Sequence, residues 1–147
     1  LKNINGTKSP ESFHKRLGKI MRDKCGMARN AAGLTEAIKE IRLLKEEFWP
    51  DLRVTGDINE FNPELDKAGR VADFIEQGEK KYLDALQRKE SCGGHFREEM
   101  QTAEGEARRD DENFAFVSAW EHKPDGWELH KEALEFEVAH PSQRSYK

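Results

Sequence analysis

The sequence predicts a mainly α-helical domain, a three-helix antiparallel bundle followed by a loop and a small β-hairpin. Apolar residues recur at helical spacing in three successive segments of the chain. Two of these segments begin with the same motif, a polar residue followed by proline and glutamate, which is typical of helix starts. Closer to the carboxyl end, apolar and polar residues alternate on both sides of a turn motif, as they do in hairpins.

The first helix is expected from Pro10 to Cys25. Ser9 can cap its amino end, Pro10 fits the first helical position, and Glu11 favours the positive end of the helix dipole. The spacing of the apolar residues places one face of this helix toward a core, formed by Phe13, Leu17, Ile20 and Met21.

The second helix is expected to begin after Thr35, which can act as its cap, because Gly33 interrupts the helical pattern before it. The dipeptide Trp49-Pro50 is expected to end this helix, since the residue before a proline avoids helical angles. Its core-facing residues recur at helical spacing: Ile38, Ile41, Leu44 and Phe48.

The third and longest helix is expected from about Pro63 to Lys89, and it begins with the motif Asn62-Pro63-Glu64. Its first apolar face is formed by Leu65, Ala68, Ala72, Ile75, Tyr82 and Leu86. An adjoining apolar face is formed by Val71, Phe74, Gly78 and Ala85. An apolar arc of this width indicates contacts on two sides. Three helices joined by short connections favour an antiparallel bundle of the spectrin-like, up-down-up kind.

The hairpin is expected from the segments "NFAFVSAWEH" and "WELHKEALEFEVA", which flank the turn motif "KPDGW". Leu134, Phe136 and Val138 recur at period two in the second segment and are expected to lie in its strand. The three tryptophans are expected to close the core rather than to form a ligand site: Trp49, Trp120 and Trp127.

These elements form one structural domain with three parts. Residues 1–9 are expected to be an irregular lead-in, residues 10–92 the bundle, and residues 93–147 the turn, acidic loop, hairpin and tail. The chain starts with Leu1 rather than methionine, and the lead-in carries no pattern of its own. We therefore expect a fragment of a longer protein.

The composition argues against several functional classes. A formal net charge of only −4 argues against nucleic-acid binding, which requires a basic face to neutralise phosphates. No apolar run approaches the ~20 residues that a membrane-spanning helix needs. Two cysteines far apart do not form a disulfide framework and favour a reducing compartment. Glycine-rich dinucleotide and phosphate-binding fingerprints are absent from the sequence.

The segment "RKESCGGHFREE", residues 88–99, follows the third helix and carries the most unusual combination of residues. Cys92 and His95 are spaced like half of a zinc site, or like a nucleophile and its base. A structural zinc needs four ligands, and the other candidates are scattered singly along the chain: His14, Cys25, His122, His130 and His140. The stronger interpretation is a docking turn, in which Gly93-Gly94 bends sharply or approaches another surface. His95 and Arg97 would then offer donors to that surface.

The acidic segment "RRDDENF" lacks the alternating acids and central glycine of a calcium loop. We expect a solvated loop with local ion pairs, and docking to a basic partner is the alternative.

Together these segments resemble the C-terminal region of the flavoprotein subunit of succinate dehydrogenase and fumarate reductase. The family's R-x-E-S-R-G-A-H-type turn is matched by Arg88, Glu90, Ser91, Gly93 and His95. Its R-D-D-x-N segment is matched by Arg109, Asp110, Asp111 and Asn113, and its terminal R-x-Y by Arg144 and Tyr146. Cys92 stands where arginine is common in the family, and Gly94 where alanine is common. No role of that arginine is therefore carried over to this chain.

The resemblance implies a parent enzyme that interconverts succinate and fumarate on a covalently held FAD. It implies partners as well: the FAD-binding and capping domains of the same subunit, an iron–sulfur subunit and, through the complex, a membrane anchor that leads to quinone. The expected location is the cytoplasmic side of the bacterial inner membrane.

No residue of this chain matches the family's catalytic or FAD-binding motifs, so no catalytic, cofactor-binding or metal role is assigned. Docking to the FAD domain is assigned to Arg88, Glu90, Ser91, Gly93, Gly94, His95 and Arg97. Three alternatives remain: a stand-alone helical interaction module, the C-terminal domain of L-aspartate oxidase, and a Cys/His redox or zinc module.

Overall fold

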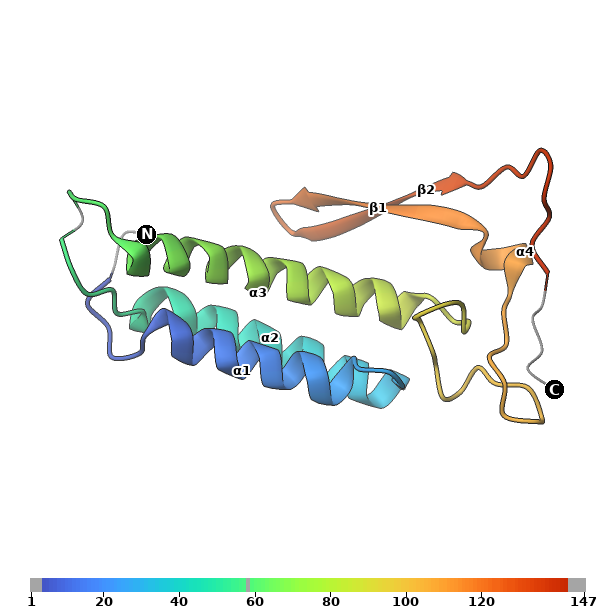
Figure 1. The fold of residues 1–147 in the computed structure, drawn as a ribbon, viewed down its shortest axis with the longest axis horizontal. Coiled ribbons are helices and arrows are strands. Elements are labelled where there is room, and N and C mark those ends of the chain that lie inside the picture. Colours follow the sequence, from blue (N-terminus) through green and yellow to red (C-terminus); the bar gives the residue numbers. More distant parts are fainter. Residues whose placement is uncertain (1–3, 58, 143–147) are drawn as a thin grey trace.

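The computed structural model describes residues 4–57 and 59–142 and shows three helices packed side by side, with a hairpin extended along one of them (Figure 1). The helices are α1 (Pro10–Lys24), α2 (Ala31–Asp51) and α3 (Pro63–Gln87). α1 and α3 run in one direction and α2 in the other, and each helix packs against the other two. The predicted antiparallel up-down-up bundle is confirmed.

The core of the bundle receives apolar side chains from all three helices. Tyr82 is completely buried, and its hydroxyl donates to the carbonyl oxygen of Ile20 at 2.7 Å. Burial also raises the pKa of Tyr82, because the ionised phenolate would be desolvated. The other large apolar residues that are almost fully buried along the bundle are Phe13, Leu34, Ile41, Leu44, Phe48, Leu52, Val71 and Ile75.

The first and third helices begin where the sequence predicts. The Ser9 hydroxyl accepts a hydrogen bond from the Ser12 amide at 3.3 Å, and Pro10 occupies the first helical position. The side-chain oxygen of Asn62 accepts from the amides of Glu64 and Leu65 at 3.0 and 3.1 Å. Each cap satisfies amides that have no partner inside the helix.

The predicted start of the second helix is wrong. Asn30 caps α2, with its side-chain oxygen accepting from the Gly33 amide at 2.8 Å. Thr35 lies within the helix, where its hydroxyl donates to the Ala31 carbonyl. The helical penalty of Gly33, about 1 kcal/mol, is offset by this cap and by the complete burial of Leu34.

The predicted end of the second helix is also wrong, because α2 continues through Pro50 to Asp51. A proline in the last turn removes only one amide donor, and the Leu52 amide still reaches the Phe48 carbonyl at 3.1 Å. Tertiary contacts then fix Asp51, whose carboxylate accepts from the Thr7 amide and hydroxyl.

Residues 4–8 form a strap along residues 51–54 and join the lead-in to the end of α2. The Gly6 amide donates to the Leu52 carbonyl, and the Val54 amide donates to the Ile4 carbonyl, each at 2.9 Å. The strap therefore supplies part of the polar pairing that the end of α2 needs.

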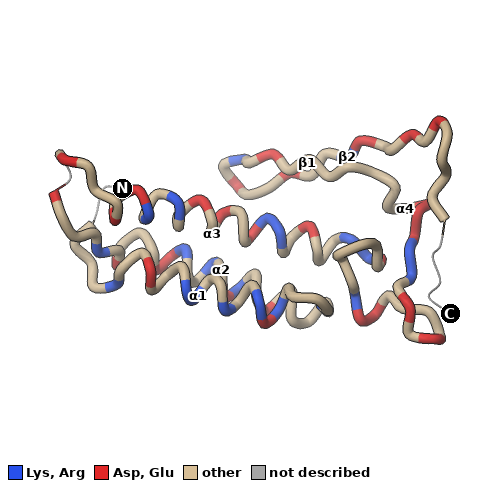
Figure 2. The backbone as a smooth tube through the Cα atoms, in the orientation of Figure 1, with Lys and Arg blue, Asp and Glu red and all other residues tan. Residues whose placement is uncertain are grey.

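Basic and acidic residues alternate along all three helices, and many of them pair (Figure 2). Among the described pairs that join two helices, Arg42 on α2 and Glu79 on α3 form the one with the most buried acidic side chain: the Arg42 Nε atom lies 2.6 Å from Glu79, whose side chain is 8% exposed. Within residues 4–57 and 59–142, no helix combines the length and apolar character required to cross a bilayer.

The predicted hairpin and its turn are confirmed. Strands β1 (Phe116–Lys123) and β2 (Gly126–Ala133) pair antiparallel, and a single helical turn, α4 (Asp111–Phe114), precedes β1. The prediction of a strand through Leu134, Phe136 and Val138 is wrong, because β2 ends at Ala133. The Leu134 amide makes one further hydrogen bond, to the Ala115 carbonyl oxygen at 2.9 Å. The residues before Ala115 form the helical turn α4, which offers no strand for Phe136 and Val138 to pair with.

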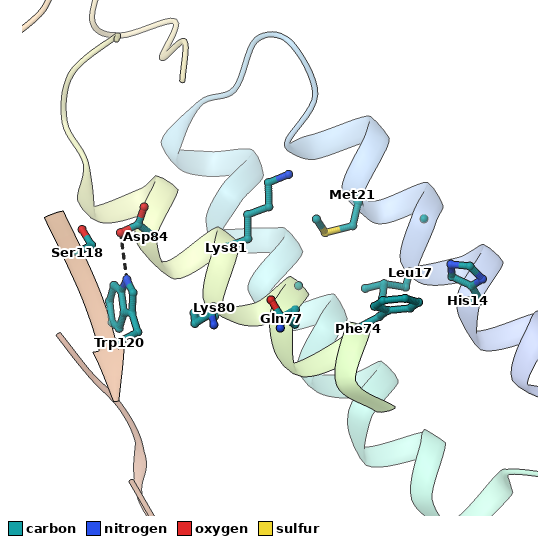
Figure 3. Close-up of a pocket in the computed structure, with 12 residues that line it drawn as sticks. His14, Leu17, Met21, Phe74, Gln77, Lys80, Lys81, Asp84, Ser118 and Trp120 are labelled. Carbon is teal, nitrogen blue, oxygen red and sulfur yellow. Dashed lines mark hydrogen bonds between the residues drawn. The ribbon is translucent and has the colours of Figure 1, made fainter. Parts of the chain in front are cut away.

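The hairpin lies over α3 (Figure 1), and Trp120 on β1 points toward Asp84 of that helix (Figure 3). The Trp120 indole nitrogen donates to Asp84 on α3 at 3.0 Å, and the ammonium of Lys80 lies 5.6 Å from the ring centroid of Trp127. These two tryptophans thus close the hairpin against α3. The predicted core-closing role is wrong for Trp49, whose side chain faces solvent and is 46% exposed.

Candidate docking site

The turn that follows α3 is a tight reversal with two glycines at its tip. The amides of Cys92 and His95 donate to each other's carbonyl oxygens at 2.8 and 3.0 Å. Gly93 has a φ of +57°, the left-handed region that glycine adopts without strain. A Cβ atom added at Gly93 or Gly94 would meet nothing within 4 Å, so neither glycine is required by a close approach within the described part of the chain.

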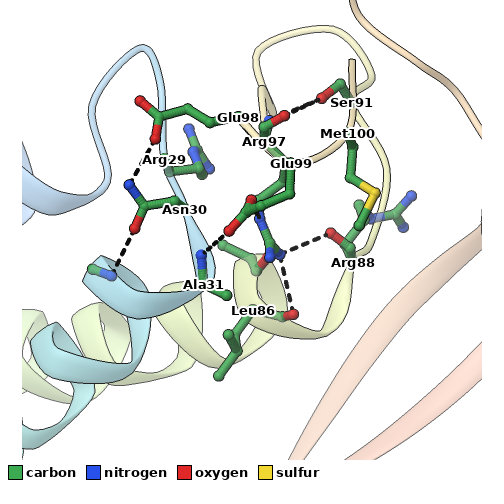
Figure 4. A network of polar contacts seen from close by, with 12 residues as sticks. Arg29, Asn30, Ala31, Leu86, Arg88, Ser91, Arg97, Glu98, Glu99 and Met100 are labelled. Atoms are coloured by element: carbon green, nitrogen blue, oxygen red, sulfur yellow. Dashed lines mark hydrogen bonds and ion pairs between the residues drawn. The ribbon is translucent and has the colours of Figure 1, made fainter. Parts of the chain in front are cut away.

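Arg97 lies inside the turn and caps α3, with only 3% of its surface exposed. Its Nη1 atom donates to the carbonyl oxygens of Ala85 at 3.0 Å and Leu86 at 3.2 Å, which the last helical turn leaves without partners (Figure 4). The positive charge also complements the negative end of the helix dipole. Ser91 holds this arginine in place, because its buried hydroxyl accepts from the Arg97 amide at 2.8 Å.

His95 connects the turn to two other segments through its ring. Its Nδ1 atom lies 3.3 Å from Arg29 Nη1, and its Nε2 atom lies 2.9 Å from the Arg88 carbonyl oxygen. Since arginine can only donate and a carbonyl can only accept, the ring must carry its proton on Nε2. Burial lowers the pKa of His95, and the guanidinium groups of Arg29, Arg97 and Arg88 lower it further.

Arg29, in the connection between α1 and α2, is the main partner of the turn. Its Nη2 atom donates to the carbonyl oxygens of Gly26 and Gly94, each at 3.1 Å. Its amide donates to the Phe96 carbonyl, and its carbonyl accepts from the Glu98 amide. The turn is therefore fastened to the far end of the α1–α2 pair.

Arg88 and Glu90 fasten the turn to the start of the hairpin. Arg88 Nη1 lies 2.7 Å from Glu90 Oε1, and Glu90, which is 3% exposed, also accepts from the Asp110 amide at 3.0 Å. The Arg88 guanidinium donates to the carbonyl oxygens of Phe114 and Phe116 and lies 5.1 Å from the centre of the Phe116 ring. Hydrogen bonds to a charged group of this kind are the stronger ones in proteins.

The acidic segment forms a capped helical turn with local ion pairs. The Asp110 carboxylate accepts from the Asn113 amide and side-chain nitrogen, and Arg109 pairs with Asp111 at 2.6 Å. The predicted local ion pair is present, but the predicted loop is wrong from Asp111 to Phe114, where the chain forms the helical turn α4.

The structure brings all seven predicted docking residues together, but most of them face inward. The side chains of Arg88, Glu90, Ser91, His95 and Arg97 bond within the chain, and the exposed tip is formed by Gly93 and Gly94. Sequence reasoning missed Arg29 and Asn30, which pair with residues 94–98. Asn30 had a readable signal as a polar residue before a helical run, whereas no local pattern connects Arg29 to the turn.

The two chemical interpretations of Cys92 and His95 gain no support from the geometry. Both ring nitrogens of His95 are engaged by Arg29 and the Arg88 carbonyl, so the hydrogen bonds of the ring do not orient it as a base for Cys92. Among the described residues, the metal-type ligands that gather in a group of three are Glu121, Glu128 and His130 on the hairpin. The Lys123 ammonium already pairs with the two carboxylates of that group.

Comparisons with known proteins agree with the resemblance that the sequence motifs suggest. The model of a family described as "Fumarate reductase flavoprotein C-term" matches residues 14–146. The fumarate reductase flavoprotein subunit of Haemophilus influenzae is 27% identical over 109 residues, which are 74% of this chain and 17% of that protein.

Solved structures share the fold. FrdA of E. coli quinol fumarate reductase has a TM-score of 0.81 and 25% identity, over 96% of this chain and 23% of that chain. Mycobacterium smegmatis Sdh1 in complex with UQ1 has a TM-score of 0.76 and 22% identity, over 90% of this chain and 22% of that chain.

The family match covers nearly the whole chain, including Arg144 and Tyr146, which lie outside the residues that the structure describes. This chain spans less than a quarter of the length of each of the three relatives. The chain belongs to the C-terminal domain family of the fumarate reductase and succinate dehydrogenase flavoproteins.

Proposed function

We propose that this chain is the C-terminal region of a flavoprotein subunit that holds FAD covalently and interconverts succinate and fumarate. The observation that carries the proposal is the family match over residues 14–146, in a chain that spans only 17% of its Haemophilus influenzae relative. Electrons would pass between the flavin and quinone through an iron–sulfur subunit and a membrane anchor. The complex would lie on the cytoplasmic side of the bacterial inner membrane.

In this proposal the chain supports the enzyme mechanically, and the chemistry belongs to the flavin in the rest of the subunit. The bundle braces the FAD and capping domains, and the turn at residues 88–97 forms part of the contact. The five inward-facing residues of the turn hold its shape, and the Gly93-Gly94 tip meets the partner domain. The support for this division of roles is that Arg88, Glu90 and Arg97 all bond within the chain, beside an open glycine tip.

The first experiment examines the native protein. An antibody raised against this chain is used to blot an extract of the source cells, and flavin fluorescence is read in the same band after denaturation in acid. We expect a fluorescent band far above 17.0 kDa. A dark band at 17.0 kDa would instead identify a stand-alone interaction module.

Substrate specificity is tested on the same protein. We expect succinate to reduce the flavin and fumarate to reoxidise it. Flavin reduction by L-aspartate but not by succinate would assign the chain to an L-aspartate oxidase. The 147-residue chain alone is expected to bind no flavin and to turn over no succinate, so a yellow, active preparation of it would contradict the proposal.

A further inference from the structure

An apolar groove of about 600 Å³ lies between α1, α3 and β1 (Figure 3). Its walls include Leu17 and Met21 from α1, Phe74 from α3 and Trp120 from β1. Phe74 is 46% exposed, although most large apolar residues of α3 are buried or half-buried. A contiguous apolar hollow of this kind on a folded domain marks an interaction site.

Two glycines shape the groove. A Cβ atom at Gly78 would lie 3.2 Å from the side chain of Leu17, so this glycine lets α1 and α3 approach each other. A Cβ atom at Gly18 would meet nothing within 4 Å, which means that Gly18 leaves open space in the wall of the groove. The first glycine is explained by packing within the bundle, whereas the second is not.

The groove ends in a cationic cleft beside the docking turn. Lys81 and Asp84 line both the groove and a second cleft of about 460 Å³, which also includes Arg29, Arg88 and His95. The Asp84 carboxylate already accepts from Trp120, and Lys81 forms no ion pair with any residue that the structure describes. The apolar surface therefore runs into a positively charged end that suits a carboxylate.

The hairpin wall of the groove has little support from the bundle. It contacts α3 chiefly through the Trp120–Asp84 hydrogen bond and the stacking of Lys80 on Trp127. A two-stranded hairpin is marginally stable unless a further element packs against it. An occupant between α1 and β1 would supply that packing.

We propose that the rest of the same flavoprotein polypeptide docks in this groove. The docking segment would place large apolar side chains between α1 and α3 and one of its carboxylates in the cationic cleft. The identity of the occupant rests on the proposed function and on the greater length of the relatives. This chain covers only 17% of its Haemophilus influenzae relative and 23% of the E. coli chain. The continuity of the cleft with the turn at Gly94 and His95 places the groove and the glycine tip on one docking surface.

The test measures thiol accessibility in the full-length protein. A cysteine is introduced at Gly18, in the groove, and separately at Gly69, another helical glycine whose added Cβ would also meet nothing within 4 Å. Cys92, which is partly exposed, is replaced by serine in both proteins, while Cys25 is buried. We expect a maleimide to label Gly18→Cys at least about tenfold more slowly than Gly69→Cys in the native state, since labelling then requires local opening. In denaturant the two should react equally.

Each outcome decides a different question. If the full-length protein proves not to be a flavoprotein, the proposed function fails and the inference fails with it. If it is a flavoprotein but Gly18→Cys reacts as fast as Gly69→Cys, the groove is open and only the inference fails. Two further outcomes would also overturn the inference. If the slow labelling of Gly18→Cys is lost on dilution while the mass halves, a second copy of the protein covers the groove. If the slow labelling is lost when another subunit is removed, that subunit covers the groove.

A charge reversal tests the same surface without a thiol. In isolation Lys81→Glu would place a carboxylate beside Arg29 and Arg88, which this chain should tolerate. In the full-length protein the new carboxylate would repel the partner's carboxylate. We therefore expect Lys81→Glu to lower the unfolding temperature of the full-length protein, whereas Lys39→Glu, at an exposed position on α2 away from the groove and the turn, leaves it unchanged. Equal effects of the two variants would overturn the inference.

Discussion

The guanidinium group of Arg97 closes the carboxyl end of α3, with its Nη1 atom donating to the carbonyl oxygen of Ala85 at 3.0 Å. Replacing Arg97 with alanine would leave buried carbonyl groups of the last helical turn without donors. Because the side chain is 3% exposed, solvent cannot compensate, and we expect a loss of about 2–4 kcal/mol in the free energy of unfolding. Urea denaturation followed by circular dichroism measures this loss.

A matched control for this prediction is Arg22→Ala in the last turn of α1. The Arg22 side chain is 78% exposed, so its replacement should change the free energy of unfolding by less than about 0.5 kcal/mol. Similar losses for the two variants would show that Arg97 does not cap α3 as the geometry indicates.

His95 predicts a dependence of stability on pH. Burial lowers its pKa below the ordinary value of 6.5, and the nearby guanidinium groups of Arg29, Arg97 and Arg88 act in the same direction. A histidine with a lowered pKa binds fewer protons in the folded state than in the unfolded state. Its contribution to stability is therefore complete above pH 6.5 and is lost as the pH falls through the folded-state pKa.

The measurement compares wild type with His95→Gln by urea denaturation between pH 8 and pH 5. We expect wild type to lose more stability over this range, because glutamine cannot titrate. An NMR titration that places the His95 pKa at or above 6.5 would contradict the prediction.

The strap at residues 4–8 should respond to acid separately from His95, because two carboxylates hold it. Hydrogen bonds from Arg16 and then Lys8 lower the pKa of Glu47 to about 2, and hydrogen bonds from Lys8 and Thr7 lower the pKa of Asp51 to about 2. Their contribution to stability is complete above the ordinary values of 4.5 and 3.8 and is lost as the pH falls toward 2.

We expect the strap to detach from the end of α2 in this acid range before the bundle unfolds. Amide hydrogen exchange of residues 4–8, corrected for its intrinsic pH dependence, measures the detachment. Asp51→Asn should weaken the pH dependence, since the neutral amide does not titrate. Exchange that stays equally slow from pH 5 to pH 2 would contradict this prediction.

The helix starts at Ser9 and Asn62 could be predicted because the cap, the proline and the glutamate lie within three consecutive residues. The start of α2 carried a similar local signal in Asn30, but Gly33 obscured it. Its end could not be read locally. Pro50 stays helical because the strap, more than 40 residues earlier, binds Asp51.

The candidate site shows the same division between local and distant information. The turn at Gly93 requires a residue with left-handed backbone angles, and the glycine at this position indicates it in the sequence. The inward direction of His95 depends instead on Arg29, which lies 66 residues away in the chain. Local motifs therefore located the turn but could not determine which way its side chains point.

Gly94 offers the sharpest test of the docking role of the turn. Gly93→Val strains the fold by itself, because a φ of +57° disfavours a branched side chain. Gly94 has no such restriction, and a Cβ atom there meets nothing within 4 Å. We therefore expect Gly94→Val to leave the stability of the 147-residue chain unchanged while it weakens contact with the flavin domain in the full-length protein.

Urea denaturation of the short chain and flavin retention in the full-length protein measure the two effects. Equal stability and equal flavin retention would place the partner elsewhere, whereas destabilisation of the short chain would show that Gly94 serves the turn itself.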